Sequence, residues 1–348
     1  MDDITPPTAD RTEMTQFIND LFHHVMGIRN PPATWTDPWV NLALATGDPL
    51  AIFNKFIAGK FNTDRLNALE DTATRWPTGH FYSPVVSRAE VRTEWPRLTA
   101  PRAPAAVDMQ AEAQRILFRN LARHFDTMPF HNEKDGVHRY YFDNPSYNYG
   151  DALIYWSMLN RFKPKRILEV GSGFSSALAL DTVDALGLPT VCTFVDPFPE
   201  VARAATAPMS PPHAILPIKI QNIDFAILDE LGEDDILFID SSHVVKTGSD
   251  VHFEITELLP RIRPGVIVHF HDVFYPFEYR RQWAIEDNHS WNELYFLQAF
   301  LMYNTDFRIE FFNHFMARQL TETVHQAAPA QAKRFLLNPG GGLWLRRM

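Results

Sequence analysis

The stretch Arg166-Ile-Leu-Glu-Val-Gly-Ser-Gly-Phe-Ser-Ser176 is the clearest fold signal in the sequence. Its apolar beginning, 166–170, predicts a short strand, and the glycines at 171 and 173 let the chain turn tightly beside a ligand. A helix is expected to begin near Phe174, so that its free backbone N–H groups face the same crevice. In open α/β sheets, ligands bind beyond the carboxyl ends of the strands, where the strand order reverses. The stretch therefore predicts the first strand and the ligand-binding turn of a Rossmann-like sheet.

Further short apolar runs follow this strand and alternate with segments of helical character. The strands expected after the first are 190–195, 215–220, 236–240 and 265–270, followed by two later runs at 307–312 and 342–346. Two helices, 107–125 and 150–162, are expected before the first strand. Strands separated by helices form βαβ units, which build a parallel sheet with helices on both faces. The expected fold class is α/β.

The first hundred residues have a different pattern. Segments 13–26 and 48–61 show helical spacing, and the Pro-bearing stretch 95–104 indicates a linker or an extended arm. We therefore expect two domains: an N-terminal helical module with a linker arm (1–105) and an α/β domain (106–348).

The charge balance, the cysteine count and the distribution of apolar residues indicate which substrates and which cellular compartment to expect. The chain has 348 residues, with 32 basic and 42 acidic side chains and a formal net charge of −10. This acidic balance argues against a nucleic-acid partner, because phosphate contacts need clustered positive charge, and favours a small molecule. The single cysteine excludes an intrachain disulfide and a cysteine-based zinc cluster. The sequence shows neither a secretory signal nor a membrane span, so we expect a cytoplasmic protein. The sequence does not indicate an oligomeric state.

The glycine turn suits S-adenosylmethionine better than a dinucleotide. The dinucleotide fingerprint needs a third glycine where this chain has Ser176. Glu169 lies two residues before the first glycine, and a carboxylate there suits a ligand with an ammonium group but would repel a pyrophosphate. The residues expected to bind the methyl donor on this turn are Glu169, Gly171, Ser172 and Gly173.

Later strand ends supply further candidates for this nucleoside site. Asp196 ends the second strand, 23 residues after Gly173, where an acid commonly binds the ribose hydroxyls; the alternative is a loop-initiating Asp before Pro197. Asn222 follows the third strand and is expected to contact the adenine, with helix capping as the alternative. Asp240, at the end of the fourth strand, is expected to face the donor as well.

Two neighbouring strand ends could hold a divalent cation. Asp240 ends the fourth strand and His271-Asp272 ends the fifth, so two carboxylates and an imidazole converge at one edge of the sheet. A cation there would bind a substrate hydroxyl and lower its pKa. His243 could act as the general base, because the ordinary pKa of histidine, about 6.5, suits proton removal near neutrality. Capping of the next helix by Asp240 and a turn role for Asp272 remain alternatives, and His269 is expected to be a satisfied core histidine.

Taken together, Glu169-Val-Gly171-Ser-Gly173, the acid at 196 and Phe238-Ile-Asp-Ser-Ser-His243 resemble the class I S-adenosylmethionine-dependent methyltransferases. More narrowly, they resemble the metal-dependent small-molecule O-methyltransferases of the macrolide-sugar and catechol types. The resemblance covers roughly 140–291. It implies a seven-stranded sheet whose last strand is antiparallel, which agrees with the two late runs.

The resemblance also implies roles at the reaction centre. The macrolide-sugar enzymes have a catalytic histidine at the position of His243, and metal ligands at Asp240 and at an acidic pair that matches His271-Asp272. The histidine at 271 departs from that pair and shifts the expected metal from magnesium toward manganese, iron or zinc. Ser175 departs from the glycine that many members have.

The sequence therefore predicts methyl transfer from S-adenosylmethionine to a hydroxyl of a small molecule, assisted by a divalent metal such as Mg, Mn or Fe. One alternative is an NAD-dependent oxidoreductase on a Rossmann fold. Another is a non-catalytic protein that binds S-adenosylmethionine. A mononuclear iron site formed by His243, His271 and Asp240 is a third.

Overall fold

The structure is a computed structural model that describes residues 10–26, 31–46, 76, 78–100 and 102–348. The chain divides into two compact units, residues 1–83 and residues 84–348. The helix expected at 48–61 lies outside the described residues. Among the residues that are described, no helix is long and apolar enough to cross a membrane.

The described part of the first unit is a pair of helices, α1 (Arg11–Met26) and α2 (Ala33–Thr46). Their apolar side chains form a small core of their own, made of Met14, Phe17, Ile18, Leu21, Phe22, Val40 and Ala43. The α1 members recur at intervals of three and four residues, which places them on one helix face. The helix expected at 13–26 is confirmed.

The second unit begins with a helix that was not expected. In α5 (Arg88–Leu98), the Ser87 side chain caps the first turn by accepting a hydrogen bond from the Glu90 backbone N–H at 3.3 Å. Arg88 Nε donates to the carbonyl oxygen of Ile285 at 2.9 Å, which ties this helix to the α/β unit. The prediction of a linker or arm from residue 95 is therefore wrong for 95–98. The overlooked signal was the Ser-x-x-Glu capping pattern.

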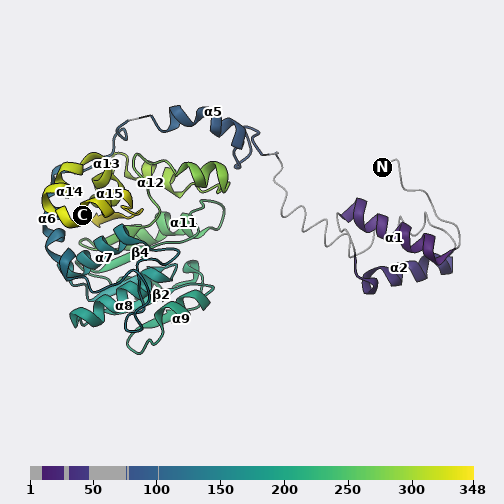
Figure 1. The fold of residues 1–348 in the computed structure, drawn as a ribbon, viewed down its shortest axis with the longest axis horizontal. Coiled ribbons are helices and arrows are strands. Elements are labelled where there is room, and N and C mark those ends of the chain that lie inside the picture. Colours follow the sequence, from purple (N-terminus) through teal and green to yellow (C-terminus); the bar gives the residue numbers. More distant parts are fainter. Residues whose placement is uncertain (1–9, 27–30, 47–75, 77, 101) are drawn as a thin grey trace. The chain divides into compact units, whose positions relative to one another are not determined.

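The core of the second unit is a seven-stranded sheet in the order β3-β2-β1-β4-β5-β7-β6 (Figure 1). Its strands are β1 (Arg166–Val170), β2 (Val191–Val195), β3 (Ala214–Leu216), β4 (Ile236–Ile239), β5 (Ile267–Phe270), β6 (Phe307–Phe312) and β7 (Leu343–Arg347). The first five strands are parallel, and β7 lies antiparallel between β5 and β6. The predicted α/β class and mostly parallel seven-stranded sheet are confirmed.

Helices connect the strands and lie on both sides of the sheet (Figure 1). They are α6 (Ala111–Leu121), α7 (Tyr149–Phe162), α8 (Phe174–Leu186), α9 (Glu200–Thr206), α10 (Phe225–Asp229), α11 (Asp250–Phe253), α12 (Glu293–Leu301), α13 (Asn313–Gln319), α14 (Thr321–Ala327) and α15 (Pro329–Leu337). The strand order proceeds one way from β1 to β3 and the other way from β4 to β5. Right-handed connections therefore place α8 and α9 on one face and α11 on the other.

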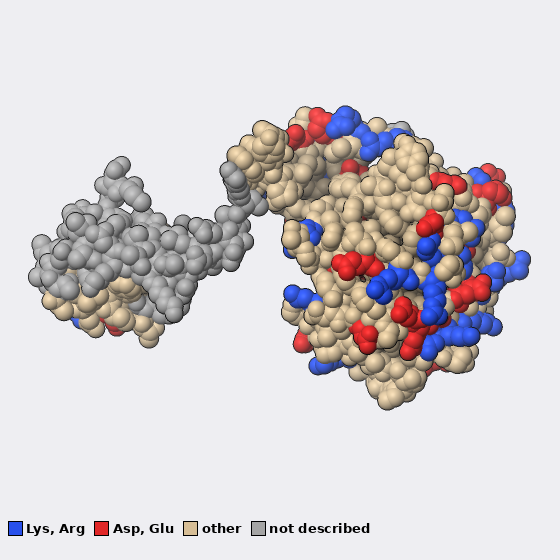
Figure 2. Space-filling model, turned by 180° about the vertical axis from the view of Figure 1, so that it is seen from behind, with Lys and Arg blue, Asp and Glu red and all other residues tan. Residues whose placement is uncertain are grey.

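The central strands are buried because helices cover both faces, as their apolar composition requires. All four residues of β4 and of β5 are buried. β3 is shorter than expected, because Pro217 follows Leu216 and the chain then forms a short 3₁₀ turn at Ile220–Asn222. On the face shown in Figure 2, basic and acidic side chains of this unit are interspersed.

The strand order reverses between β1 and β4, and at this point the two chain segments approach very closely. Gly171 has φ +75°, and a Cβ at this position would overlap the carbonyl oxygen of Asp240. The Asp240 backbone N–H donates to the Val170 carbonyl oxygen at 2.8 Å, which fixes the approach. Glycine is therefore required at position 171 for two reasons: the backbone is left-handed there, and no space is left for a side chain.

We predict that Gly171→Ala lowers the free energy of unfolding by at least about 3 kcal/mol, because strain at positive φ adds to a backbone clash. The matched control is Gly187→Ala, at φ +59° with no atom within 4 Å of the added Cβ, where a loss of about 1 kcal/mol is expected. Urea unfolding of both variants measures the difference. Equal losses would contradict the role of the close approach.

Candidate functional site

Two neighbouring cavities open at the carboxyl ends of β1, β2 and β4. The larger has a volume of about 530 Å³, and its lining includes Val170, Asp196, Phe198, Lys219, Ile220, Gln221, Ser242, Lys246 and Asp250. The smaller has a volume of about 230 Å³, and its lining includes Ser146, Tyr147, Ser172, Gly173, Phe174, Ser175 and Val201. Gly171, Asp196 and Asp240 line both. Five of the residues predicted to bind the methyl donor therefore line one or both cavities: Gly171, Ser172, Gly173, Asp196 and Asp240.

A buried carboxyl group stabilises the glycine turn through two serine hydroxyls. Glu169 is fully buried, and its Oε1 accepts hydrogen bonds from Ser175 Oγ at 2.6 Å and Ser176 Oγ at 2.7 Å. Ser176 Oγ also accepts from the Gly173 N–H at 3.0 Å. Burial raises the pKa of Glu169 to about 8, against the opposing effect of the two serine hydroxyls. Glu169 lines neither cavity, so it supports the turn while Ser172 and Gly173 face the crevice.

The predicted ribose ligand lies where expected, and the predicted adenine ligand does not line the cavity. Asp196 accepts backbone hydrogen bonds from Ser172 at 3.0 Å and Phe198 at 2.8 Å, one on each carboxylate oxygen. Its orientation toward the crevice is therefore fixed. Asn222 is exposed and absent from the lining of either cavity, whereas the neighbouring Gln221 lines the larger one and donates to the Gly248 carbonyl oxygen at 3.0 Å.

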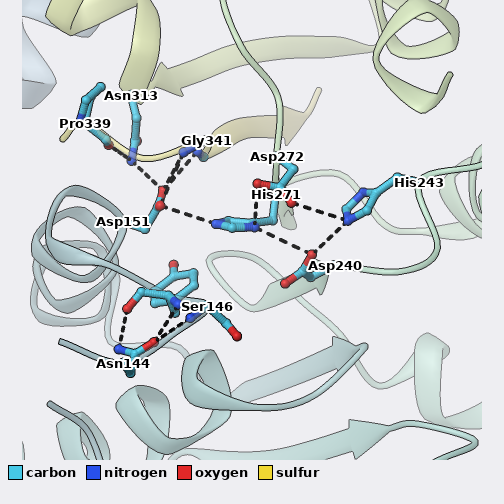
Figure 3. A network of polar contacts seen from close by, with 12 residues as sticks. Asn144, Ser146, Asp151, Asp240, His243, His271, Asp272, Asn313, Pro339 and Gly341 are labelled. Atoms are coloured by element: carbon cyan, nitrogen blue, oxygen red, sulfur yellow. Dashed lines mark hydrogen bonds and ion pairs between the residues drawn. The ribbon is translucent and has the colours of Figure 1, made fainter. Parts of the chain in front are cut away.

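Beside Asp240, the ends of β4 and β5 bring acids and histidines together (Figure 3). His243 Nε2 lies 3.4 Å from Asp240 Oδ1 and 3.5 Å from Asp272 Oδ2. His271 Nδ1 lies 3.6 Å from Asp240 Oδ1 and 3.5 Å from Asp272 Oδ1. All four residues that the sequence singled out at these strand ends therefore converge.

His243 is held by a residue whose role sequence reasoning missed. Its Nδ1 lies 2.8 Å from Glu293 Oε2, and both side chains are buried. The backbone N–H groups of Asn292 and Glu293 donate to the His243 carbonyl oxygen at 3.1 Å. A carboxylate accepts hydrogen bonds, so Nδ1 carries a proton, and Nε2 is the ring nitrogen that faces Asp240 and Asp272. The only sequence signal was an acid in the first turn of α12.

His271 is held from its other side by a second missed residue, Asp151. His271 Nε2 lies 3.3 Å from Asp151 Oδ2. The Asp151 carboxylate accepts hydrogen bonds from Gly341 N at 3.1 Å, Gly342 N at 3.0 Å and Asn313 Nδ2 at 3.1 Å. The glycine-rich turn before β7 thus wraps around the Asp151 carboxylate. The sequence predicts a turn there but does not show that this turn contacts Asp151.

The acidic and histidine side chains of this cluster shift one another's pKa values. Burial would raise the pKa of Asp240, but the neighbouring His271 and His243 imidazoles outweigh it and lower that pKa. Burial would lower the pKa of His243, but the Asp240 and Glu293 carboxylates raise it above its usual value. His269 lies deeper, packed on Phe238 with ring centroids 4.1 Å apart. It is buried in the core as predicted, but the expectation that its ring nitrogens are hydrogen-bonded is wrong, because neither has a partner in the described part of the chain.

The donor atoms fit a divalent cation. Asp240, His243 and Asp272 each offer one ligand atom, and these atoms lie within 4.8 Å of one another. Two carboxylate oxygens and an imidazole nitrogen are common ligands of divalent metals. The ligand set predicted from the sequence was Asp240, His271 and Asp272. The structure groups His243, which was predicted to be the base, with Asp240 and Asp272.

The amino-acid sequence has relatives in this region. Residues 168–273 match the family model described as "Methyltransferase domain". An uncharacterized protein of Archaeoglobus fulgidus is 33% identical over 114 residues, which cover 30% of this chain and 50% of that protein. The chain thus spans about half the length of this relative.

The solved structures that resemble this chain have low sequence identity and low TM-scores. One is the apo-structure of CmcI-N160, with 15% identity and a TM-score of 0.31 over 58% of this chain and 72% of that chain. Another is the plantazolicin methyltransferase BpumL in complex with a triazolic desmethylPZN analog and SAH, with 12% identity and a TM-score of 0.36 over 69% of this chain and 99% of that chain.

The family match spans β1 to the end of β5, including the glycine turn and both strand ends of the acid–histidine cluster. By this match, residues 168–273 carry a methyltransferase domain within a seven-stranded, mostly parallel sheet.

Proposed function

We propose that the protein transfers a methyl group from S-adenosylmethionine to a hydroxyl of a small molecule, with the help of a divalent cation. The observation that carries this proposal is that Asp240 lines both cavities of the donor crevice and also belongs to the acid–histidine cluster. A methyl donor in the crevice and an acceptor at the cluster would therefore be neighbours. Holding two reactants side by side supplies much of the acceleration of an in-line transfer.

The donor would lie across the two cavities. The larger cavity suits the adenosine, with Asp196 accepting hydrogen bonds from the ribose hydroxyls, because carboxylate oxygens have acceptor capacity beyond their backbone partners. Gln221 replaces Asn222 as the candidate for the adenine. The smaller cavity, lined by Ser172 and Gly173, suits the methionine end.

The acceptor would lie against the acid–histidine cluster. A divalent cation bound there would lower the pKa of the acceptor hydroxyl. Asp240, Asp272 and a histidine would hold the cation. His243 Nε2 is placed for one of two roles, binding the cation or taking the hydroxyl proton, and the Glu293 contact orients it for either.

Aromatic side chains beside His243 favour a flat or partly apolar acceptor. The Trp291 ring lies 4.5 Å from the His243 ring and 5.2 Å from the Trp283 ring, between centroids. Tyr279 packs at 6.1 Å from Trp291. Such a wall would bind a ring by contact area and leave the hydroxyl to the polar cluster.

We expect saturable, micromolar binding of S-adenosylmethionine in a calorimetric titration of the full chain, and no binding of NADH. Asp196→Asn should weaken donor binding about tenfold or more, because the amide loses the charged acceptor for the ribose. Asn222→Ala is the matched control and should bind as the wild type does. Binding of NADH without binding of S-adenosylmethionine would favour an oxidoreductase and overturn the proposal.

We expect exhaustive chelation to lower methyl transfer at least about tenfold, because the bare acceptor hydroxyl is a weak nucleophile near neutral pH. Added divalent ions should restore the activity. The measurement is transfer of labelled methyl to an acceptor found by screening hydroxylated small molecules. Unchanged activity after chelation would remove the cation from the proposal and leave the methyl transfer in place.

Glu169 generates a prediction on stability. Its folded pKa of about 8 lies above the ordinary value of about 4.5, so unfolding releases a proton between these pH values and stability falls as pH rises through them. Glu169→Gln keeps a neutral side chain. The variant should therefore gain stability relative to the wild type by up to about 1.4 kcal/mol per pH unit in this window.

Urea unfolding from pH 5 to pH 7, both values lying inside that window, measures the gain. Glu257→Gln, at an exposed position, is the matched control for the same exchange. A difference between Glu169→Gln and the wild type that stays constant with pH would show that Glu169 is ionised in the folded protein.

A further inference from the structure

Two histidines, each with a carboxylate behind it, approach Asp240 and Asp272. Figure 3 shows His243 and His271 on opposite sides of these two aspartates. On one side, Glu293 holds His243 Nδ1 at 2.8 Å. On the other, Asp151 lies 3.3 Å from His271 Nε2. In each pair the second ring nitrogen lies 3.4–3.6 Å from carboxylate oxygens of Asp240 and Asp272.

This arrangement is typical of metal-binding histidines. A histidine that binds a metal almost always donates its other ring N–H to a carboxylate, carbonyl or water, which fixes the tautomer and the ring orientation. Both histidines have such a carboxylate behind them, at Glu293 and at Asp151. Structural ion pairs alone would not require both rings to turn their remaining nitrogen to the same pair of acids.

His271 provides a second, independent observation. Its side chain is buried, with 5% of its surface exposed, and its Nδ1 has no hydrogen-bond partner in the described part of the chain, whereas Nε2 lies 3.3 Å from Asp151. A buried polar nitrogen without a partner is costly. A cation between His271, Asp240 and Asp272 would give Nδ1 its partner.

Asp151 is fixed strongly enough to orient a ligand. Besides its bonds from Gly341, Gly342 and Asn313, it is enclosed by Gly340, where a Cβ would overlap the carboxylate. As an acceptor, Asp151 directs the Nε2–H of His271 toward itself and leaves the Nδ1 lone pair toward the strand ends.

We propose that Asp240, His243, His271 and Asp272 form a single centre with two histidines and two carboxylates, which binds a first-row transition metal ion in preference to Mg²⁺. The inference rests on the proposed function, whose cation it identifies by class. Asp151 and Glu293 are positioning residues of this centre. Two imidazoles select Fe²⁺, Co²⁺ or Zn²⁺, because Mg²⁺ prefers oxygen ligands and keeps much of its water. In this centre His243 would bind the cation, and the acceptor hydroxyl, whose pKa the cation would lower, would lose its proton to solvent water.

The test uses the full chain after removal of metals by a chelator and dialysis. Co²⁺ is the probe, because its visible absorption reports nitrogen ligation, and Mg²⁺ is titrated in parallel by calorimetry. We expect Co²⁺ to bind at least about 100-fold more tightly than Mg²⁺. His271→Glu replaces the imidazole by a hard ligand and should lower this preference at least about tenfold.

The roles of the positioning residues Asp151 and Glu293 are tested separately, by the Co²⁺ affinity of their variants. Asp151→Asn and Glu293→Gln should each weaken Co²⁺ binding about 10- to 100-fold, while the affinity for S-adenosylmethionine stays within about twofold. His252→Ala, at an exposed position on α11, is the matched control and should keep the wild-type Co²⁺ affinity. Thermal unfolding is measured for each variant. Should His271→Glu fail to fold, His271→Gln takes its place, with weaker Co²⁺ binding expected.

Equal affinity for the two ions, no binding of Co²⁺, or an unchanged preference in the His271 variant would overturn the inference. A titration of the wild type with S-adenosylmethionine separates this failure from failure of the proposed function. Donor binding without the metal preference rejects the two-histidine centre alone. Absence of donor binding rejects the methyltransferase proposal itself.

Discussion

The close approach of the glycine turn to the end of β4 is the constraint on which the rest of the site depends. Gly171 allows the Asp240 backbone to lie directly against the turn, and the bond from Asp240 N–H to the Val170 carbonyl oxygen holds it there. The Asp240 side chain can then border the donor crevice and reach the acid–histidine cluster. A larger residue at 171 would separate the two halves of the site.

The sequence predicted the sheet well where strand composition and turn chemistry agree. β1 and β6 have the expected bounds, because each ends at a clear change of residue type, at Gly171 and at Asn313. β3 was overextended, because an apolar run continues past Pro217 although the strand does not. The helix α5 was missed, because three prolines in 95–104 suggested an arm, and the capping pattern before them was overlooked.

The candidate site was predictable only where neighbouring strand ends deliver its residues. Asp240, His271 and Asp272 follow from strand order, because parallel strands end at one edge of the sheet. Asp151 and Glu293 come from helices that are distant in sequence, and nothing in their local pattern shows which ring nitrogen they hold. The ring orientation that distinguishes a metal ligand from a general base is therefore a property of tertiary packing.

The position of β7 has a consequence for the order in which the chain can fold during synthesis. This strand lies between β5 and β6 but is made after both, and the turn before it encloses Asp151. A nascent chain that ends before residue 340 already contains Asp151 and the residues that line the two cavities, but it lacks the Gly341 and Gly342 N–H groups that hold the Asp151 carboxylate. The support behind His271 is therefore completed only when the last strand of the chain has been made.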